Sequence, residues 1–168
     1  MEAGQLSIRC ISPEEIEVFK LIRLEALRCE PASFASKSED WETLADEDWR
    51  QRLSDPVFVA FNNAEPVGLM GMLRFRPAKM AHRATLVMVY VRESSRGTGV
   101  AKKLLRSVFD HARQQGVTQI ELSVSAANSV AIRFYRNQGF SEIARIPNGF
   151  LENTITVEEM IMMRRLDC

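Results

Sequence analysis

The spacing of apolar residues changes along the middle of the chain, and each change predicts a boundary between elements. Leu86–Val91 is apolar throughout, which is typical of a strand buried on both faces. A helical face then begins, formed by Val100, Ala101, Leu104, Leu105, Val108, Phe109 and Ala112. Thr118–Ser125 alternates apolar and polar residues and predicts a second strand. Because a strand, a helix and a strand usually form a right-handed crossover, we expect the two strands to be parallel.

The same reasoning predicts a hairpin and two helices before this unit, and one helix and two strands after it. In chain order, the expected elements are a strand at Leu6–Ile11, a helix from the Ser12 cap and Pro13 to about Cys29, a loop at Glu30–Glu42, a helix at Leu44–Leu53, hairpin strands at Val57–Phe61 and Val67–Phe75, a basic loop from Arg76 to His82, a helix capped by Asn128 and ended by Gly139, a strand at Phe140–Ile146, a turn at Pro147–Gly149 and a last strand at Glu158–Leu166. Gly68 and Gly71 predict a bulge or a close backbone approach in the hairpin.

Composition narrows the class of protein. The 168 residues are 46% apolar and 26% charged with a net charge of zero, which favours a single globular domain spanning residues 1–168. The absence of a basic excess argues against a nucleic-acid partner. No apolar run is long enough to cross a membrane, and the N-terminus does not resemble a secretory signal, so we expect a cytoplasmic protein without a membrane partner. The scattered Cys10, Cys29 and Cys168 and the two histidines predict no metal site.

The glycine turn between the central strand and helix carries candidate chemistry. Arg96-Gly97-Thr98-Gly99 stands directly before Val100, where free backbone N–H groups and the helix dipole favour an anion. Lys102, Lys103 and Arg106 add positive charge nearby, although they also fit a solvated helix face. A phosphate or pyrophosphate is the natural ligand of such a turn.

Two common phosphate motifs fit this turn poorly. The chain contains no Gly-x-x-x-x-Gly-Lys-Ser/Thr string, which a P-loop requires. The dinucleotide fingerprint Gly-x-Gly-x-x-Gly would need glycine where Lys102 stands. Both motifs are therefore disfavoured.

A third motif matches better. Arg96 to Ala101 resembles the Gln/Arg-x-x-Gly-x-Gly/Ala signature of the GNAT superfamily of N-acetyltransferases, with alanine as an accepted final residue. Asn128 to Phe140 is similar to that family's Asn-x-x-Ala-x-x-x-Tyr-x-x-x-Gly-Phe motif, and the two motifs have the family's order and spacing. Glu93 stands where the family often has proline, which could alter the geometry of the turn.

The resemblance implies an α/β fold. Its sheet is mixed, twisted and mostly antiparallel, with one splayed parallel strand pair and about four flanking helices. It also implies acetyl-CoA as co-substrate, without a metal. The pyrophosphate would sit at the turn and the pantetheine arm against the backbone of the central strand. The residues implied in cofactor binding are Val89, Tyr90, Val91, Arg96, Gly97, Thr98, Gly99, Val100, Ala101, Lys102, Asn128 and Tyr135.

The activity implied is direct attack of a primary amine on the thioester in a ternary complex, with a small-molecule or peptide amine as acceptor. Tyr135 would be the general acid to the leaving thiolate, since a phenol with a pKa near ~10 is protonated at neutral pH. Periodicity alone favours a core aromatic at Tyr135, and the motif match reverses that preference; Asn128 is equally well explained as a helix cap. The alternative function is a non-catalytic acyl-CoA sensor with the same fold.

The general base stays open. His82 could titrate near neutrality, and Glu93 ends the central strand, but each also reads as an ordinary surface residue. The other candidates are Tyr90, Glu121, Ser123, Ser125 and a chain of water molecules.

The resemblance assigns the acceptor pocket to the first helical region and the hairpin, with the C-terminal strand region nearby. Here that region is Glu30–Trp41, with Phe75 nearby and with acids at Glu39, Asp40 and Glu42 that could attract an amine or simply be solvated. The sequence does not identify the acceptor or the oligomeric state, although exposed edge strands would allow a homodimer.

Overall fold

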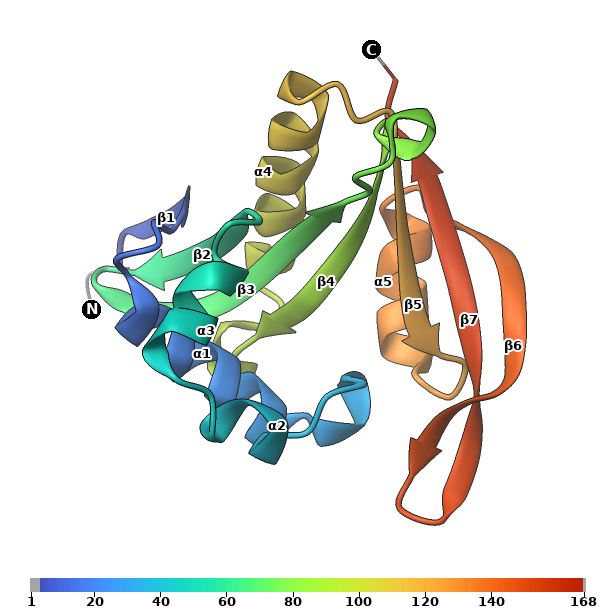
Figure 1. Ribbon diagram of the computed structural model, residues 1–168, viewed down its shortest axis with the longest axis horizontal. Coiled ribbons are helices and arrows are strands. Elements are labelled where there is room, and N and C mark those ends of the chain that lie inside the picture. The colour runs from blue at the N-terminus through green and yellow to red at the C-terminus, as the bar shows by residue number, and fades with distance from the viewer. Residues whose placement is uncertain (1–3, 168) are drawn as a thin grey trace.

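The computed structural model describes residues 4–167, which contain one seven-stranded sheet of order β1-β2-β3-β4-β5-β7-β6 (Figure 1). The strands are β1 (Leu6–Cys10), β2 (Val57–Asn62), β3 (Glu65–Arg74), β4 (Arg83–Val91), β5 (Gln119–Ser125), β6 (Ser141–Glu152) and β7 (Ile155–Arg165). Among these strands β4 and β5 form the one parallel pair. The expected mixed, mostly antiparallel α/β sheet is therefore confirmed.

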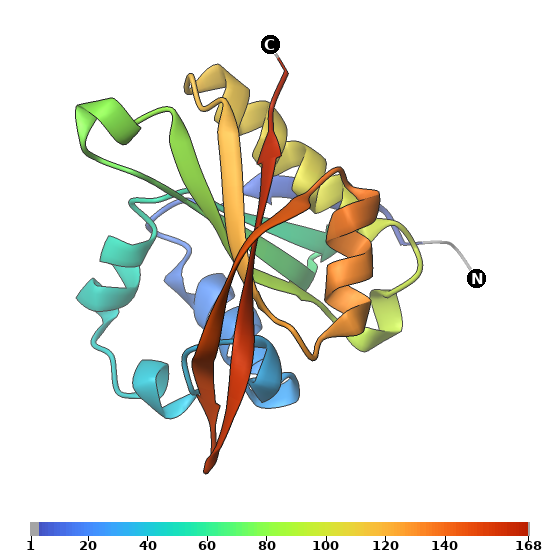
Figure 2. The same cartoon turned by 90° about the vertical axis from the view of Figure 1, so that its right-hand side faces the viewer.

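Helices pack on both faces of this sheet (Figures 1 and 2). The α-helices are α1 (Ile16–Cys29), α2 (Glu39–Glu42), α3 (Asp46–Arg52), α4 (Val100–Gln114) and α5 (Ser129–Asn137), and the short 3₁₀ turns are η1 (Pro31–Ser33), η2 (Ala78–Met80) and η3 (Glu93–Ser95). Apolar side chains of α4 and α5 share one core with the sheet, whereas those of α1 and α3 form a second core. The α-helix beyond the expected four is α2, one turn inside the predicted loop.

The helix α4 has the buried face that its spacing predicted. Val100, Leu104 and Leu105 are buried, as are the apolar residues of its later turns. Gly116 ends the helix in the left-handed conformation, with φ at 73°. The N–H of Val117 then donates to the Ala112 carbonyl at 2.9 Å, which is the Schellman closure of a helix C-terminus.

The start of α1 differs from the prediction. Ser12 and Pro13 lie in a turn, and the helix begins at Ile16. The Glu15 carboxylate accepts from the Ser12 N–H at 2.8 Å and from the Arg9 guanidinium at 2.6 Å. These bonds hold the Ser12–Glu15 segment as a turn, so the serine does not cap a helix.

The turn expected at Pro147–Gly149 was also wrong. These residues lie inside β6, where the register with β7 shifts between Ile146 and Phe150 and Asn148 has a φ of 55°. The Thr156 hydroxyl of β7 donates to the Asn148 side chain across the irregularity at 2.7 Å. The chain reverses later, at residues 153–154, so β6 and β7 form a longer hairpin than expected.

A bulge interrupts the β3–β4 pairing, as the glycines predicted. Gly71 pairs with Val87 and Leu69 pairs with Tyr90, so two residues of β4 oppose one of β3. Met88 takes the positive φ of 56° within this bulge. A Cβ at Gly68 would come within 2.9 Å of the Tyr90 carbonyl oxygen, which explains the need for glycine there.

Two further features concern the described residues only. Within residues 4–167 no helix has the length and apolar character needed to span a bilayer. Cys10 and Cys29 are free and exposed, and Cys168 lies outside the described residues.

The strand β6 is one edge of the sheet and has exposed apolar side chains such as Ile143. The expected homodimer stays a prediction.

Candidate active site

The site opens where β4 and β5 part. The two strands pair only between Arg83–Thr85 and Gln119–Glu121, and toward their C-terminal ends they diverge (Figure 1). A first cavity of about 690 Å³ lies in this opening. Its wall includes Leu86–Val91 of β4 and Leu122–Val124 of β5. Because β5 does not pair with β4 beyond Thr85, one backbone edge of β4 faces the cavity without a strand partner.

The glycine turn lies at the end of this cavity. Gly97 and Gly99 have φ values of 74° and 85°, and no atom lies within 4 Å of a Cβ built at either position. Gly99 is the N-cap residue of α4 and provides no side-chain cap, so the N–H groups of the first turn are left for another acceptor. Gly97, Gly99 and Val100–Lys102 all line the cavity. The open N-terminus of a 15-residue helix thus faces the space between the splayed strands.

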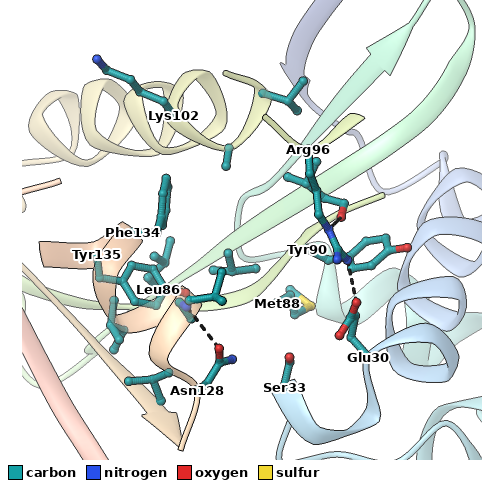
Figure 3. A pocket seen from close by; sticks show the side chains of 18 of the residues that line it. Glu30, Ser33, Leu86, Met88, Tyr90, Arg96, Lys102, Asn128, Phe134 and Tyr135 are labelled. Atoms are coloured by element: carbon teal, nitrogen blue, oxygen red, sulfur yellow. Dashed lines mark hydrogen bonds and ion pairs between the residues drawn. The ribbon is translucent and has the colours of Figure 1, made fainter. Parts of the chain in front are cut away.

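Arg96 and Thr98 stabilise the turn by local bonds. Arg96 donates through Nε to the Val91 carbonyl at 2.9 Å and forms an ion pair with Glu30 at 2.7 Å. The Thr98 hydroxyl donates to the Ser95 carbonyl at 2.6 Å, and Thr98 is not among the cavity-lining residues. Arg96 therefore lines the cavity while tying β4 to the segment after α1 (Figure 3).

Tyr135 enters the opposite wall from α5 (Figure 3). Its side chain is 7% exposed, and its ring packs edge-on against Phe134 and Phe140. Burial raises the pKa of the phenol above its ordinary value of 10, so the hydroxyl keeps its proton at neutral pH. The hydroxyl has no hydrogen-bond partner among residues 4–167, which leaves its proton free for a ligand.

Asn128 is the helix cap that the sequence allowed, and its contact with a cofactor stays a prediction. Its side-chain oxygen accepts from the Ala131 N–H at 3.1 Å and caps α5. It also lines the first cavity, about two helical turns from Tyr135. The cap fixes the start of the helix that carries the phenol.

The structure does not bring His82 or Glu93 to the cavity. His82 precedes β4 at the end where β4 and β5 are paired, and its carbonyl accepts from the Thr118 N–H at 2.9 Å. Glu93 is exposed in η3. Neither residue lines either of the two cavities: the strands separate only beyond Thr85, and of η3 it is Ser95 that lines the first cavity.

Of the other candidate bases, Tyr90 and Glu121 are engaged by other side chains, whereas Ser123 and Ser125 line a cavity. Tyr90 lines the cavity, but its hydroxyl donates to Glu25 of α1 at 3.0 Å, on the side away from Tyr135 (Figure 3). Burial and the Glu25 carboxylate raise the pKa of the Tyr90 phenol. Glu121 is paired with Arg83 at 2.8 Å. Ser123 is the one of these side chains that lines both cavities.

A second cavity of about 740 Å³ adjoins the first. The residues that line both are Ser33, Phe34, Leu86, Val87, Met88, Ser123 and Val124. The far walls of the second cavity come from α1, η1, α2, α3 and the β6–β7 hairpin. Of the expected acceptor region, residues 32–36 and Trp41 are present, whereas Phe75, Glu39, Asp40 and Glu42 are not among the lining residues.

The charged residues of the second cavity were missed by the sequence analysis. They are Arg23, Arg52, Asp55, Glu152 and Glu159. Arg23 had a detectable signal, because it falls four residues after Phe19 and four before Leu27 on the buried face of α1. A charged residue at such a position is unusual enough to mark a site.

A cavity between splayed strands, closed at one end by a helix N-terminus, is typical of proteins that hold an extended phosphate-bearing ligand. Comparison with known families agrees with this class: residues 21–140 match the model of the Acetyltransferase (GNAT) family. The chain therefore belongs to that family, which confirms the resemblance seen in the two motifs.

Individual relatives share about a third of their residues with this chain over the aligned segments. Over 104 residues the chain is 33% identical to a mycothiol acetyltransferase of Brachybacterium faecium, a match covering 58% of this chain and 31% of that protein. Over 101 residues it is 30% identical to an L-methionine sulfoximine/L-methionine sulfone acetyltransferase of Pseudomonas aeruginosa, covering 60% and 59%. These matches span less than two thirds of either relative.

Solved structures share the fold across nearly the whole chain. A GNAT-family acetyltransferase of Streptococcus pneumoniae aligns with a TM-score of 0.84 at 17% identity, covering 97% of this chain and all of that one. The yncA protein of Salmonella typhimurium, solved with its cofactor acetyl-CoA, aligns with a TM-score of 0.83 at 20% identity, covering 98% and 96%. At these identities the likeness concerns the fold.

Proposed function

We propose that this protein transfers the acetyl group of acetyl-CoA to a primary amine by direct attack in a ternary complex. One observation carries the proposal: the open N-terminus of α4, the unpaired edge of β4 and the Tyr135 hydroxyl all line the same cavity. Membership of an acetyltransferase family and the acetyl-CoA complex of a protein of the same fold support the choice of co-substrate.

The chain's own groups fit such a co-substrate. The first-turn N–H groups of α4 and the Lys102 ammonium would bind the pyrophosphate, since the space beside Gly97 and Gly99 is free of protein atoms. The backbone of Val89–Val91 would pair with the pantetheine arm at the edge that β5 leaves open. A backbone N–H of this edge would polarise the thioester carbonyl and stabilise the oxyanion that forms on attack.

Two proton transfers complete the reaction. Tyr135 would donate its proton to the departing thiolate. Because burial raises the pKa of the phenol, the hydroxyl would stay protonated until negative charge develops on the sulfur. The amine would arrive through the second cavity, whose carboxylates are Asp55, Glu152 and Glu159. Glu159 is our candidate base, because it pairs in register with Ser125 at the C-terminal end of β5, where the strands have parted.

Release of free thiol from acetyl-CoA over a panel of amines tests this function. We expect at least one amine to release CoA and to give one N-acetyl product per thiol by mass spectrometry. Acetyl-CoA binding without turnover on any amine of the panel would contradict the proposal. The cytoplasmic location and the absence of nucleic-acid or membrane partners stay predictions from the sequence.

A further inference from the structure

The second cavity contains a buried charge without a partner. Arg23 of α1 is 4% exposed and lines this cavity. Its Nε and Nη1 are shielded from solvent and have no hydrogen-bond partner, and Arg23 takes part in none of the ion pairs among residues 4–167. A buried unpaired charge is costly, so native proteins rarely keep one unless a ligand completes it.

The surroundings of Arg23 hold its guanidinium without neutralising it. Its central carbon lies 4.5 Å from the Trp41 ring centre and 4.8 Å from that of Phe34. Arg52, which lines the same cavity, lies over Trp41 as well, at 4.8 Å. Burial and the nearby Arg52 lower the pKa of Arg23 to about 10, so the group is still a cation at neutral pH.

The opposite wall has the opposite charge. Glu152 and Glu159 of the β6–β7 hairpin line the same cavity. The end formed by α1 and α3 has Arg23 and Arg52 beside the single carboxylate of Asp55, which forms no ion pair with either arginine among residues 4–167, whereas the end near the mouth of β5 is anionic. A molecule with a carboxylate and an ammonium group complements both ends.

We propose that Arg23 binds the carboxylate of the acceptor, so that the substrate class is a free amino acid or a closely related amino carboxylate. This inference rests on the proposed function, since it concerns the acceptor of the same transfer. A guanidinium can bind a carboxylate through two parallel N–H···O bonds, which would fix the acceptor's orientation. The amine would then point toward the strand opening and its thioester. Arg23 is in this scheme a substrate-binding residue that takes no part in proton transfer.

The first experiment uses the wild-type protein with acetyl-CoA and matched acceptors. Each of the common α-amino acids is compared with its amide and with its decarboxylated amine, by thiol release and product mass. We expect kcat/KM for the best amino acid to exceed that of its neutral partners by about 100-fold or more, because a buried donor left unpaired penalises the analogue. Equal rates for acid and amide would overturn the proposal and leave the acetyltransferase function intact.

The second experiment uses Arg23→Met, which keeps an unbranched apolar stem at this position but removes the guanidinium and its charge. We expect the acid-to-amide ratio of kcat/KM to fall to near one, mainly through a higher KM for the acid. We also expect the thermal midpoint to equal or exceed that of the wild type, because a buried unpaired charge has been removed. A purely structural arginine would instead give a lower midpoint and an unchanged ratio. Arg50→Gln on the outer face of α3, which lines neither cavity, is the matched control.

The third experiment measures binding without turnover. Trp41 and Trp49 are the only tryptophans of the chain, and Trp41 lines the cavity against Arg23. Titration of the CoA-bound protein with amino acids should change tryptophan fluorescence, while their amides should not. If no amine is ever acetylated, the proposed function fails, and this titration still decides whether a carboxylate binds at Arg23. Should Arg23→Met fail to fold, the acid-against-amide comparisons in the wild type decide alone.

Discussion

At the scale of single residues, Tyr135 combines three properties that its motif alone did not settle. The residue is buried, and burial raises the pKa of its phenol, so the hydroxyl is protonated at neutral pH. The hydroxyl also has no hydrogen-bond acceptor within the described residues. The hydroxyl is not among the solvent-shielded side-chain atoms without a partner, so it is open to the cavity that Tyr135 lines. In the proposed function the phenol is a donor to a ligand, and this role stays a prediction.

Tyr135→Phe should therefore separate activity from stability. We expect kcat to fall by about 100-fold or more, because a general acid is removed. The free energy of unfolding should change by less than about 0.5 kcal/mol, since no internal hydrogen bond is lost. Steady-state kinetics and chemical denaturation of the same preparation measure both.

Tyr90→Phe is the comparison for stability, because it removes the chain's other phenol hydroxyl. That hydroxyl does donate to Glu25, so we expect a loss of about 1 kcal/mol of unfolding free energy. If Tyr135→Phe is the more destabilising of the two and kcat is retained, Tyr135 is structural.

Glu159→Gln tests the candidate base at the same scale. We expect kcat/KM at neutral pH to fall by about 100-fold, and the fall to shrink as the pH rises and more of the amine is already neutral. Glu93→Gln, outside both cavities, is the comparison. A pH profile of Glu159→Gln parallel to that of the wild type would assign the proton to water.

At the scale of elements, the turn before α4 has a natural control at the other end of the same helix. Gly97 and Gly116 both have positive φ, at 74° and 73°, and neither has an atom within 4 Å of a Cβ built there. Gly97→Glu and Gly116→Glu should therefore cost similar backbone strain, about 1 kcal/mol each.

Only Gly97→Glu should weaken the binding of acetyl-CoA, because it places a negative charge where the helix N-terminus would bind a phosphate. We expect the dissociation constant measured by calorimetry to rise by about 10- to 100-fold. Equal effects of the two variants, or none from either, would remove the anion site from the proposed function.

The junction of β1 and α1 should show in the pH dependence of stability. The hydrogen bond from Arg9 lowers the pKa of Glu15 from 4.5 to about 2. A lowered folded-state pKa stabilises the fold above pH 4.5, and this stabilisation is lost as the pH falls toward 2. Glu15→Gln should therefore flatten the loss of stability between pH 4.5 and 2, by less than about 1 kcal/mol because Arg9 is exposed.

Urea denaturation at several pH values measures this effect. Arg9→Gln should remove the larger part of this pH dependence, because the Ser12 N–H still lowers the pKa of Glu15, and the double variant should match Glu15→Gln alone. Additive losses would show that the two side chains do not act as a pair.

The same junction shows why some elements were predicted wrongly from the sequence. Period and caps located α4, α5 and the β4–β5 crossover, since their apolar spacing is strong and local. The start of α1 was misplaced because the Glu15 carboxylate accepts from the Ser12 N–H and from Arg9, which holds Ser12–Glu15 as a turn ahead of the helix. Pro147–Gly149 has turn composition, yet pairing with β7 carries the chain through it as a bulge. Both errors come from contacts that a local pattern does not contain.

At the scale of the whole molecule, the sequence predicted the site residues that belong to local motifs and missed those brought together by the fold. The motif residues lie on α4, β4 and α5, and the fold brought most of them to one cavity. The second cavity is assembled from α1, η1, α2, α3 and the β6–β7 hairpin, which are far apart in sequence. Its charged residues could be found only once these segments had been placed side by side.

The last prediction concerns the seam of the sheet, which is the gap between β4 and β5 beyond Thr85. A ligand that bridges the two strands there should complete the sheet. The backbone edge of Leu86–Val91 lacks a strand partner on the β5 side, whereas Arg83–Thr85 is paired. By hydrogen–deuterium exchange we expect acetyl-CoA to slow exchange at residues 86–91 and at the first turn of α4, and to leave 83–85 unchanged. CoA without its acetyl group should protect the same amides, since the arm makes the pairing. Protection confined to α4 would mean that the ligand is held by its phosphates alone, and the seam would then have no part in binding.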